Sequence, residues 1–108
     1  LKMDINERVK IAILVKYYGN ILTDKQSKII NMYVDNNLSL SEVSEELKIS
    51  RQAVKDGLDN AINSLENIEN KLHFIARDDK IKQLIENKLP SQIDMATRLE
   101  LISVLEDN

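Results

Sequence analysis

The chain has 108 residues, the length of one ordinary domain, and is 43% hydrophobic and 31% charged with only two glycines and one proline. This composition favours long helices over hairpin-rich folds, which need more glycine, and the absence of cysteine excludes a disulfide framework, a thiolate zinc site and a cysteine nucleophile. No apolar run is long enough for a signal peptide or a membrane span, so we expect a cytoplasmic protein without membrane insertion.

The net charge of −3 is distributed unevenly along the chain. Residues 1–34 carry six Lys/Arg and three Asp/Glu, whereas residues 35–108 carry nine and fifteen. The N-terminal third is therefore mildly basic, and the acidic excess lies further along.

A first helix is predicted from apolar residues that recur every three or four positions and so share one helix face. These residues are Ile5, Val9, Ala12, Ile13 and Tyr17. Gly19 is expected to end this helix in a left-handed conformation, which a residue without Cβ adopts at no steric cost.

A second helix is predicted to begin at Thr23, because Gln26 stands at capping-box spacing from it. The polar run 35–37 should end it. Its predicted buried residues are Ile29, Ile30, Tyr33 and Val34.

Ser39 and Glu42 repeat the capping-box spacing and predict a short third helix through Leu47, and Ser50 can cap a long fourth helix. The fourth helix carries apolar residues at alternating steps of four and three: Val54, Leu58, Ala61, Leu65, Ile68, Leu72 and Ile75. This seam is interpreted first as an intramolecular core against the first and last helices, and alternatively as a dimer interface.

The pair Asp78-Asp79 is expected to interrupt or re-cap the long helix, and a fifth helix should then end at Pro90. Its apolar residues are Ile81, Leu84, Ile85 and Leu89. Ser91 with Asp94 predicts the cap of a last helix lined by Ile93, Ala96, Leu99, Ile102 and Leu105. The predicted fold is an all-α helical bundle, one domain over 1–108 with a C-terminal helical extension over about 78–107.

Residues 39–58 have the spacing of a helix-turn-helix without a wing, with Ile49 in the turn between the two helices. The second helix of such a motif presents its N-terminal residues to the DNA major groove. The residues expected there are Arg51, Gln52 and Lys55.

Arginine can donate two parallel hydrogen bonds to guanine, and glutamine can donate to and accept from adenine. Ala53 is small enough for close approach to the backbone or to a thymine methyl group. Ser39 and Ser50, with the backbone N–H groups that they cap, are candidate phosphate contacts.

The motif departs from the common pattern at Lys48, where the turn often has glycine, and at Ser44, where the first helix often has a smaller residue. Its charge balance is also unusual, with three cations and five anions over 39–60. Because a monomer with this balance should bind DNA weakly, we expect a homodimer, which doubles the phosphate contacts.

Over roughly residues 3–75 the chain resembles the YlxM family of small bacterial proteins, because four short sequence runs match motifs of that family in the same order. They are Tyr17-Tyr18-Gly19-Asn20, Leu22-Thr23-Asp24-Lys25-Gln26, Leu38-Ser39-Leu40-Ser41-Glu42-Val43 and Ile49-Ser50-Arg51-Gln52-Ala53-Val54. The resemblance implies a helix-turn-helix similar to region 4 of sigma factors, a gene beside those of the signal recognition particle, and no catalytic residues. It carries over Ser50, Arg51, Gln52 and Ala53 as recognition residues, whereas Lys55 lies where the family pattern is looser.

The leading hypothesis is a DNA-binding transcriptional regulator, a homodimer whose C-terminal helices form the dimerisation region. The alternative is an interaction module that docks to a component of the signal recognition particle or secretory targeting machinery, since the acidic surface of 35–108 would suit a basic partner. Neither hypothesis involves a cofactor, a metal or an evident small-molecule ligand. His73, the single histidine, is interpreted as a surface or packing residue, and no enzyme is expected.

Overall fold

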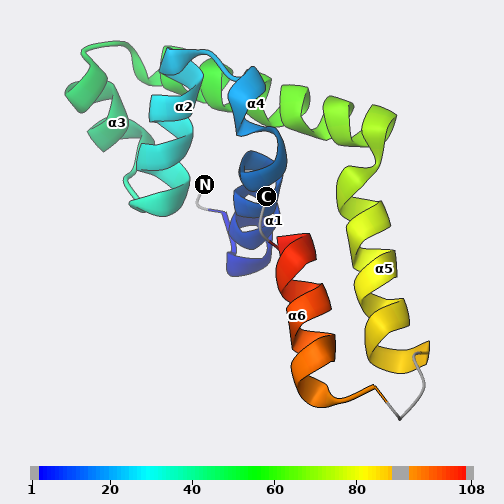
Figure 1. Cartoon of the computed structure of the whole chain (residues 1–108). Helices are drawn as coiled ribbons and strands as arrows, with labels where there is room; N and C mark the ends of the chain where they lie inside the picture. The colour runs from blue at the N-terminus through cyan, green and yellow to red at the C-terminus, as the bar shows by residue number, and fades with distance from the viewer. Residues whose placement is uncertain (1–2, 89–92, 107–108) are drawn as a thin grey trace. The chain divides into compact units, whose positions relative to one another are not determined.

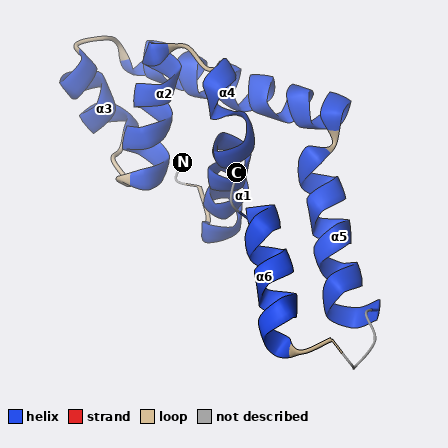
Figure 2. Cartoon of the chain, in the orientation of Figure 1, coloured by secondary structure: helices blue, strands red, loops and turns tan. Residues whose placement is uncertain are grey.

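The computed structural model describes residues 3–88 and 93–106, and these residues contain helices and loops but no strand (Figures 1 and 2). The predicted all-α fold is confirmed. In chain order the elements are α1 (Ile5–Tyr18), the 3-10 turn η1 (Gly19–Ile21), α2 (Asp24–Ile30), the π-helical turn η2 (Asn31–Asp35), α3 (Leu40–Leu47), α4 (Arg51–Leu72), α5 (Phe74–Lys88) and α6 (Met95–Glu106).

The chain divides into two compact units, Leu1–Lys71 and Leu72–Asn108. The helix-turn-helix segment lies wholly in the first unit. The single domain expected over 1–108 stays a prediction, and each unit is described by itself.

The first unit is built around a core to which α1, α2, η2, α3 and α4 all contribute. Its buried members are Ile11, Ile29, Ile30, Tyr33, Val34, Val43, Val54, Leu58 and Ala61. The four apolar residues predicted for the second helix are among them, and so are the first three residues of the seam. The seam is therefore buried within the first unit from Val54 to Ala61, whereas Leu72 near its far end is 44% exposed. The expected contact of the seam with the last helix stays a prediction.

Both capping boxes predicted in this unit are present. The Oγ1 atom of Thr23 accepts from the backbone N–H of Gln26 at 3.1 Å, and the Gln26 side chain accepts from the Thr23 N–H at 3.0 Å. Ser39 and Glu42 make the same reciprocal pair at 3.0 Å in each direction. Each pair satisfies backbone donors that the first turn of a helix leaves without a partner.

Two details of the first helix differ from expectation. The helix buries Ile11, Leu14 and Tyr18 instead of the predicted face, and Ile5 on that face is 76% exposed. Because α1 is apolar on two sides, its spacing could not select the buried one. Gly19 ends the helix as predicted, but its φ of −55° is right-handed because the chain continues into η1, where Leu22 N–H donates to the Gly19 carbonyl at 3.1 Å.

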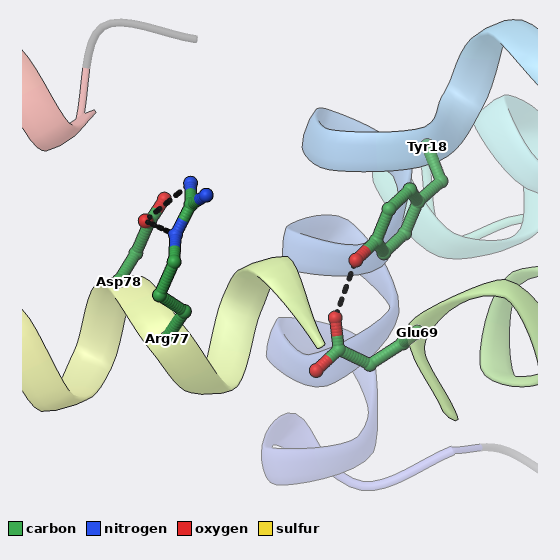
Figure 3. Close-up of polar contacts among 4 residues, drawn as sticks. All are labelled: Tyr18, Glu69, Arg77 and Asp78. Atoms are coloured by element: carbon green, nitrogen blue, oxygen red, sulfur yellow. Dashed lines mark hydrogen bonds and ion pairs between the residues drawn. The ribbon is translucent and has the colours of Figure 1, made fainter. Parts of the chain in front are cut away.

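Polar side chains tie α1 to other elements of its unit. Arg8 donates to the Val34 carbonyl and, at 2.8 Å, to the side-chain oxygen of Asn37 in the loop before α3. At the other end of α1, the Tyr18 hydroxyl donates to Glu69 of α4 at 2.5 Å (Figure 3). α1 is therefore attached to both the entry of the helix-turn-helix and the C-terminal half of its second helix.

In the second unit the predicted break at Asp78-Asp79 is wrong, because α5 runs through both residues. The break occurs at His73, an exposed residue with φ of 58°. Asp78 is tolerated inside the helix because its carboxylate accepts from Nε and Nη2 of Arg77 at 3.1 and 3.0 Å (Figure 3).

The last helix begins at Met95, so Ile93 lies before it instead of lining it. Its cap is Asp94, whose side chain accepts from the Thr97 N–H at 2.7 Å, and this hydrogen bond lowers the pKa of Asp94 below its ordinary value of 3.8. Leu89, Pro90 and Ser91 of the predicted helix boundary lie outside the described residues.

α5 and α6 form a helical hairpin (Figure 1). Two polar contacts join them. Arg98 Nη1 donates to the Ile85 carbonyl at 2.7 Å, which satisfies a backbone acceptor in the last turn of α5. Lys82 and Glu106 form an ion pair at 3.4 Å.

Candidate nucleic-acid interface

The turn between α3 and α4 has the hydrogen bonds of a Schellman motif. Lys48 ends α3 in the left-handed region, with φ of 57° and ψ of 44°, and Ile49 N–H donates back to the Ser44 carbonyl at 3.1 Å. Ser44 is itself buried, and its hydroxyl donates to the Ser41 carbonyl at 2.8 Å. Both departures from the common pattern are therefore accommodated by local hydrogen bonds.

The position of α4 depends on a close contact with α2 that the sequence did not reveal. A Cβ atom placed on Gly57 would lie 2.7 Å from Cδ1 of Ile29, which is fully buried. Glycine lets the two helices approach at this point. The signal available in sequence was a glycine inside a helical pattern, which often marks close packing.

The serines predicted to contact phosphate both act as helix caps. Ser50 Oγ accepts from the Ala53 N–H at 3.0 Å, and Ser39 Oγ accepts from the Glu42 N–H. Arg51 and Gln52 are exposed in the first turn of α4, and Ala53 beside them is half-buried.

Two of the three predicted base-reading side chains are held by acids one turn further along α4. Gln52 Nε2 donates to Asp56 at 2.8 Å, and Lys55 Nζ lies 3.1 Å from Asp59. Arg51 makes no ion pair with any residue in 3–88 or 93–106. The i,i+4 spacing of both pairs was the sequence signal that could have revealed them.

Sequence reasoning also missed two lysines of α2 beside the turn. Lys25 and Lys28 line a surface hollow together with Asp24, Leu47 and Ile49. They are 20 or more positions from the turn in sequence, and the packing of α2 against the helix-turn-helix brings them there. Hence the turn that leads into α4 is bordered by cations from another element.

The described part of the chain contains no group of three or more His, Asp or Glu side chains placed to hold a metal ion. None of its helices is long and apolar enough to cross a membrane.

The amino-acid sequence matches a family of bacterial proteins. The profile of the family UPF0122, described as "Putative helix-turn-helix protein, YlxM / p13 like", matches residues 5–104 and so extends into the C-terminal unit beyond the resemblance found in sequence. A UPF0122 protein of Pediococcus pentosaceus is 33% identical over 97% of this chain and 99% of its own. A UPF0122 protein of Malacoplasma penetrans is 41% identical over 78% of this chain and 82% of its own. A UPF0122 protein of Lactococcus lactis subsp. cremoris is 33% identical over 97% of each chain. The chain therefore belongs to the UPF0122 family of YlxM/p13-like helix-turn-helix proteins.

Proposed function

We propose that the protein is a DNA-binding transcriptional regulator that reads duplex DNA with the first turns of α4. The observation that carries this proposal is the α3–turn–α4 unit, which leaves Arg51 exposed and without an acidic partner among the described residues at the helix start. An unpaired guanidinium in that position can reach guanine O6 and N7 in a major groove.

The remaining predicted residues have supporting roles in this proposal. Gln52 and Lys55 would exchange their intrahelical acids for base or phosphate acceptors. Ser39 and Ser50 use an oxygen lone pair for capping, which leaves each hydroxyl proton available to a phosphate oxygen. Ala53 leaves room for a close approach to the backbone or to a thymine methyl group.

The test is selection of bound sites from a random duplex pool at low salt. We expect an enriched sequence, and we expect Arg51→Ala to lose preference at one or two base positions, since a bidentate arginine contributes about 1–3 kcal/mol, or roughly 5- to 150-fold, of base discrimination. Selection of the same site with equal preference by Arg51→Ala would remove Arg51 from recognition. No enrichment with the wild-type chain would contradict the proposed function.

The C-terminal hairpin supports the second part of the proposal, a homodimer joined through α5 and α6. None of the described α6 side chains is buried, although Met95, Leu99 and Val104 are apolar and 58–69% exposed. A two-helix unit of this size buries too little apolar surface to be stable without further contacts. Arg98 and Glu106 already bind α5, which leaves Glu100 as the one other charged side chain among the described residues of α6. With one remaining charge and several exposed apolar side chains, α6 suits a second copy of itself, with Glu100 at the rim of the contact.

We expect light scattering at tens of micromolar to give twice the chain mass. Leu99→Asn with Val104→Asn should raise the dimer dissociation constant at least about a hundredfold, because each apolar side chain removed from the interface loses about 1.5–3 kcal/mol. Ile5→Asn with Val9→Asn, which makes the same kind of change at two exposed apolar residues of the first unit, is the control and should stay dimeric. A wild-type chain that is monomeric under these conditions would contradict the dimer.

A second candidate function is docking to a component of the signal recognition particle or secretory targeting machinery. It is favoured by the exposed acids of α3, Glu42, Glu45 and Glu46, which would suit a basic partner. Co-purification from cells separates the two candidates. Recovery of components of the particle without DNA would support docking, and recovery of DNA fragments sharing one site would support regulation.

A further inference from the structure

Three lysines surround the turn between α3 and α4. Lys25 and Lys28 come from α2 and line one side of the hollow beside the turn. Leu47 and Ile49 line its other side, and Lys48 lies between Leu47 and Ile49 in the sequence. All three are exposed. Figure 1 shows the start of α2, the α3–α4 loop and the start of α4 at the same end of the first unit. We call Lys25, Lys28 and Lys48 the turn-flanking lysines.

Four cations of the described residues lie within 4.0 Å of an acid: Lys10, Lys55, Arg77 and Lys82. The turn-flanking lysines are not among them, and neither are Lys16, Lys71, Lys80 and Lys88. What distinguishes the turn-flanking lysines is that they gather beside one turn. Within 3–88 and 93–106, no acid lies that close to any turn-flanking lysine, even though Asp24 lines the same hollow and Glu45 and Glu46 stand in the last turn of α3. Their positive charge is therefore not neutralised by direct ion pairs within the first unit.

We infer that Lys25 and Lys28, with Lys48, bind the phosphodiester backbone of the DNA duplex whose bases α4 reads. The inference rests on the proposed function and extends it to residues outside the helix-turn-helix. DNA carries a dense row of phosphates on both sides of the groove that a recognition helix enters. The turn that these cations border leads directly into α4, where the helix dipole and Arg51 also favour negative charge.

Phosphate contacts of this kind fix the position of a protein on DNA without reading its sequence. The turn-flanking lysines would therefore contribute affinity, and Arg51 would contribute specificity. Residues 39–60 have more acids than cations, so a charge count restricted to this segment misses Lys25 and Lys28.

The test compares Lys25→Gln/Lys28→Gln with the wild-type chain by titration of the selected duplex between about 50 and about 200 mM salt. Each lost phosphate contact should reduce the slope of log affinity against log salt by about 0.9. The wild type should therefore lose about twelvefold more affinity than the double variant over this fourfold range. The site selected by the double variant should stay unchanged.

The matched control is Lys10→Gln/Lys71→Gln, which removes the same charge from the first unit. Lys71 lies 20 residues beyond Arg51 along α4, about 30 Å at 1.5 Å per residue, and Lys10 pairs with Glu66 on the same half of the helix. This control should keep the wild-type slope. Lys25→Arg/Lys28→Arg, which keeps both charges, should keep it too, and circular dichroism checks that every variant is folded.

Different outcomes would contradict the phosphate-binding role of these lysines and the proposed DNA-binding function. Wild-type binding with an unchanged slope in Lys25→Gln/Lys28→Gln, or an equal change in the Lys10→Gln/Lys71→Gln control, would overturn the phosphate-binding role alone. No binding of duplex DNA by the wild type at low salt would overturn the proposed function and the inference together. If the protein binds an RNA of equal length more tightly than the DNA duplex, and the lysine substitutions weaken only RNA binding, the lysines contact RNA and the proposed DNA contact is contradicted.

Discussion

Ile29→Ala is expected to lower the free energy of unfolding of the first unit by about 2–5 kcal/mol, the range for truncating a buried Ile or Leu side chain. Ile29 is fully buried, and its Cδ1 atom packs against Gly57 of α4. Domains are stable by only about 5–15 kcal/mol, so this loss should shift urea denaturation, followed by circular dichroism, to a much lower midpoint. Lys16→Ala, at an exposed position of α1, is the control and should stay near the wild type.

A double-mutant cycle on the same contact tests its geometry more directly. Gly57→Ala gains about 1 kcal/mol of helix propensity but places a Cβ atom against Ile29 Cδ1, the atom that Ile29→Val removes at a cost of about 0.5–1.5 kcal/mol. The alanine should therefore stabilise the Ile29→Val variant more than it stabilises the wild type. Additive effects, within about 0.5 kcal/mol, would mean that α2 and α4 are not in close contact at Gly57.

Asp56→Asn/Asp59→Asn is expected to raise affinity for the selected duplex by about tenfold to a hundredfold at about 50 mM salt. The two acids hold Gln52 and Lys55, and they also repel phosphates. Two unit charges about 8 Å apart interact by about 0.5 kcal/mol at an effective dielectric constant of about 80 and about 2 kcal/mol at about 20, so removing two repulsions gives an effect of this size.

The control for this experiment is Glu66→Gln, which removes one acid 15 residues, or about 22 Å, further along α4 than Arg51. It should change affinity much less than Asp59→Asn alone, and the difference should shrink as salt rises because exposed charges are screened. Lower or unchanged affinity in the double variant would show that the acids help to present Gln52 and Lys55 for binding.

Local features of the fold could be predicted from sequence because their causes lie within a few residues. The capping boxes at Thr23 and Ser39 depend on two side chains three positions apart. The boundary between α4 and α5 was placed wrongly because acids were taken as a helix break, although Arg77 can neutralise Asp78 from the adjacent position. His73, which makes the actual break, carries no glycine-like signal in the sequence.

The parts of the candidate site that were missed depend on packing between distant segments. The proposed base-reading residues Arg51, Gln52 and Lys55 follow from spacing within one motif. The lysines of α2 join them because Ile29 and Ile30 bury one side of that helix against α4 and its neighbours, which leaves Lys25 and Lys28 outward at the turn. The periodicity of the second helix identified its buried side but not the element that would cover it.

Lys48, the left-handed residue in the turn of the helix-turn-helix, affects both the stability of the fold and the positive charge beside α4. Glycine in place of Lys48 would relieve on the order of 1 kcal/mol of backbone strain, since φ of 57° is unfavourable for a residue with a side chain. The same change would remove one cation from the border of α4. At this position glycine would therefore raise thermal stability, whereas lysine strengthens the attraction for a polyanion.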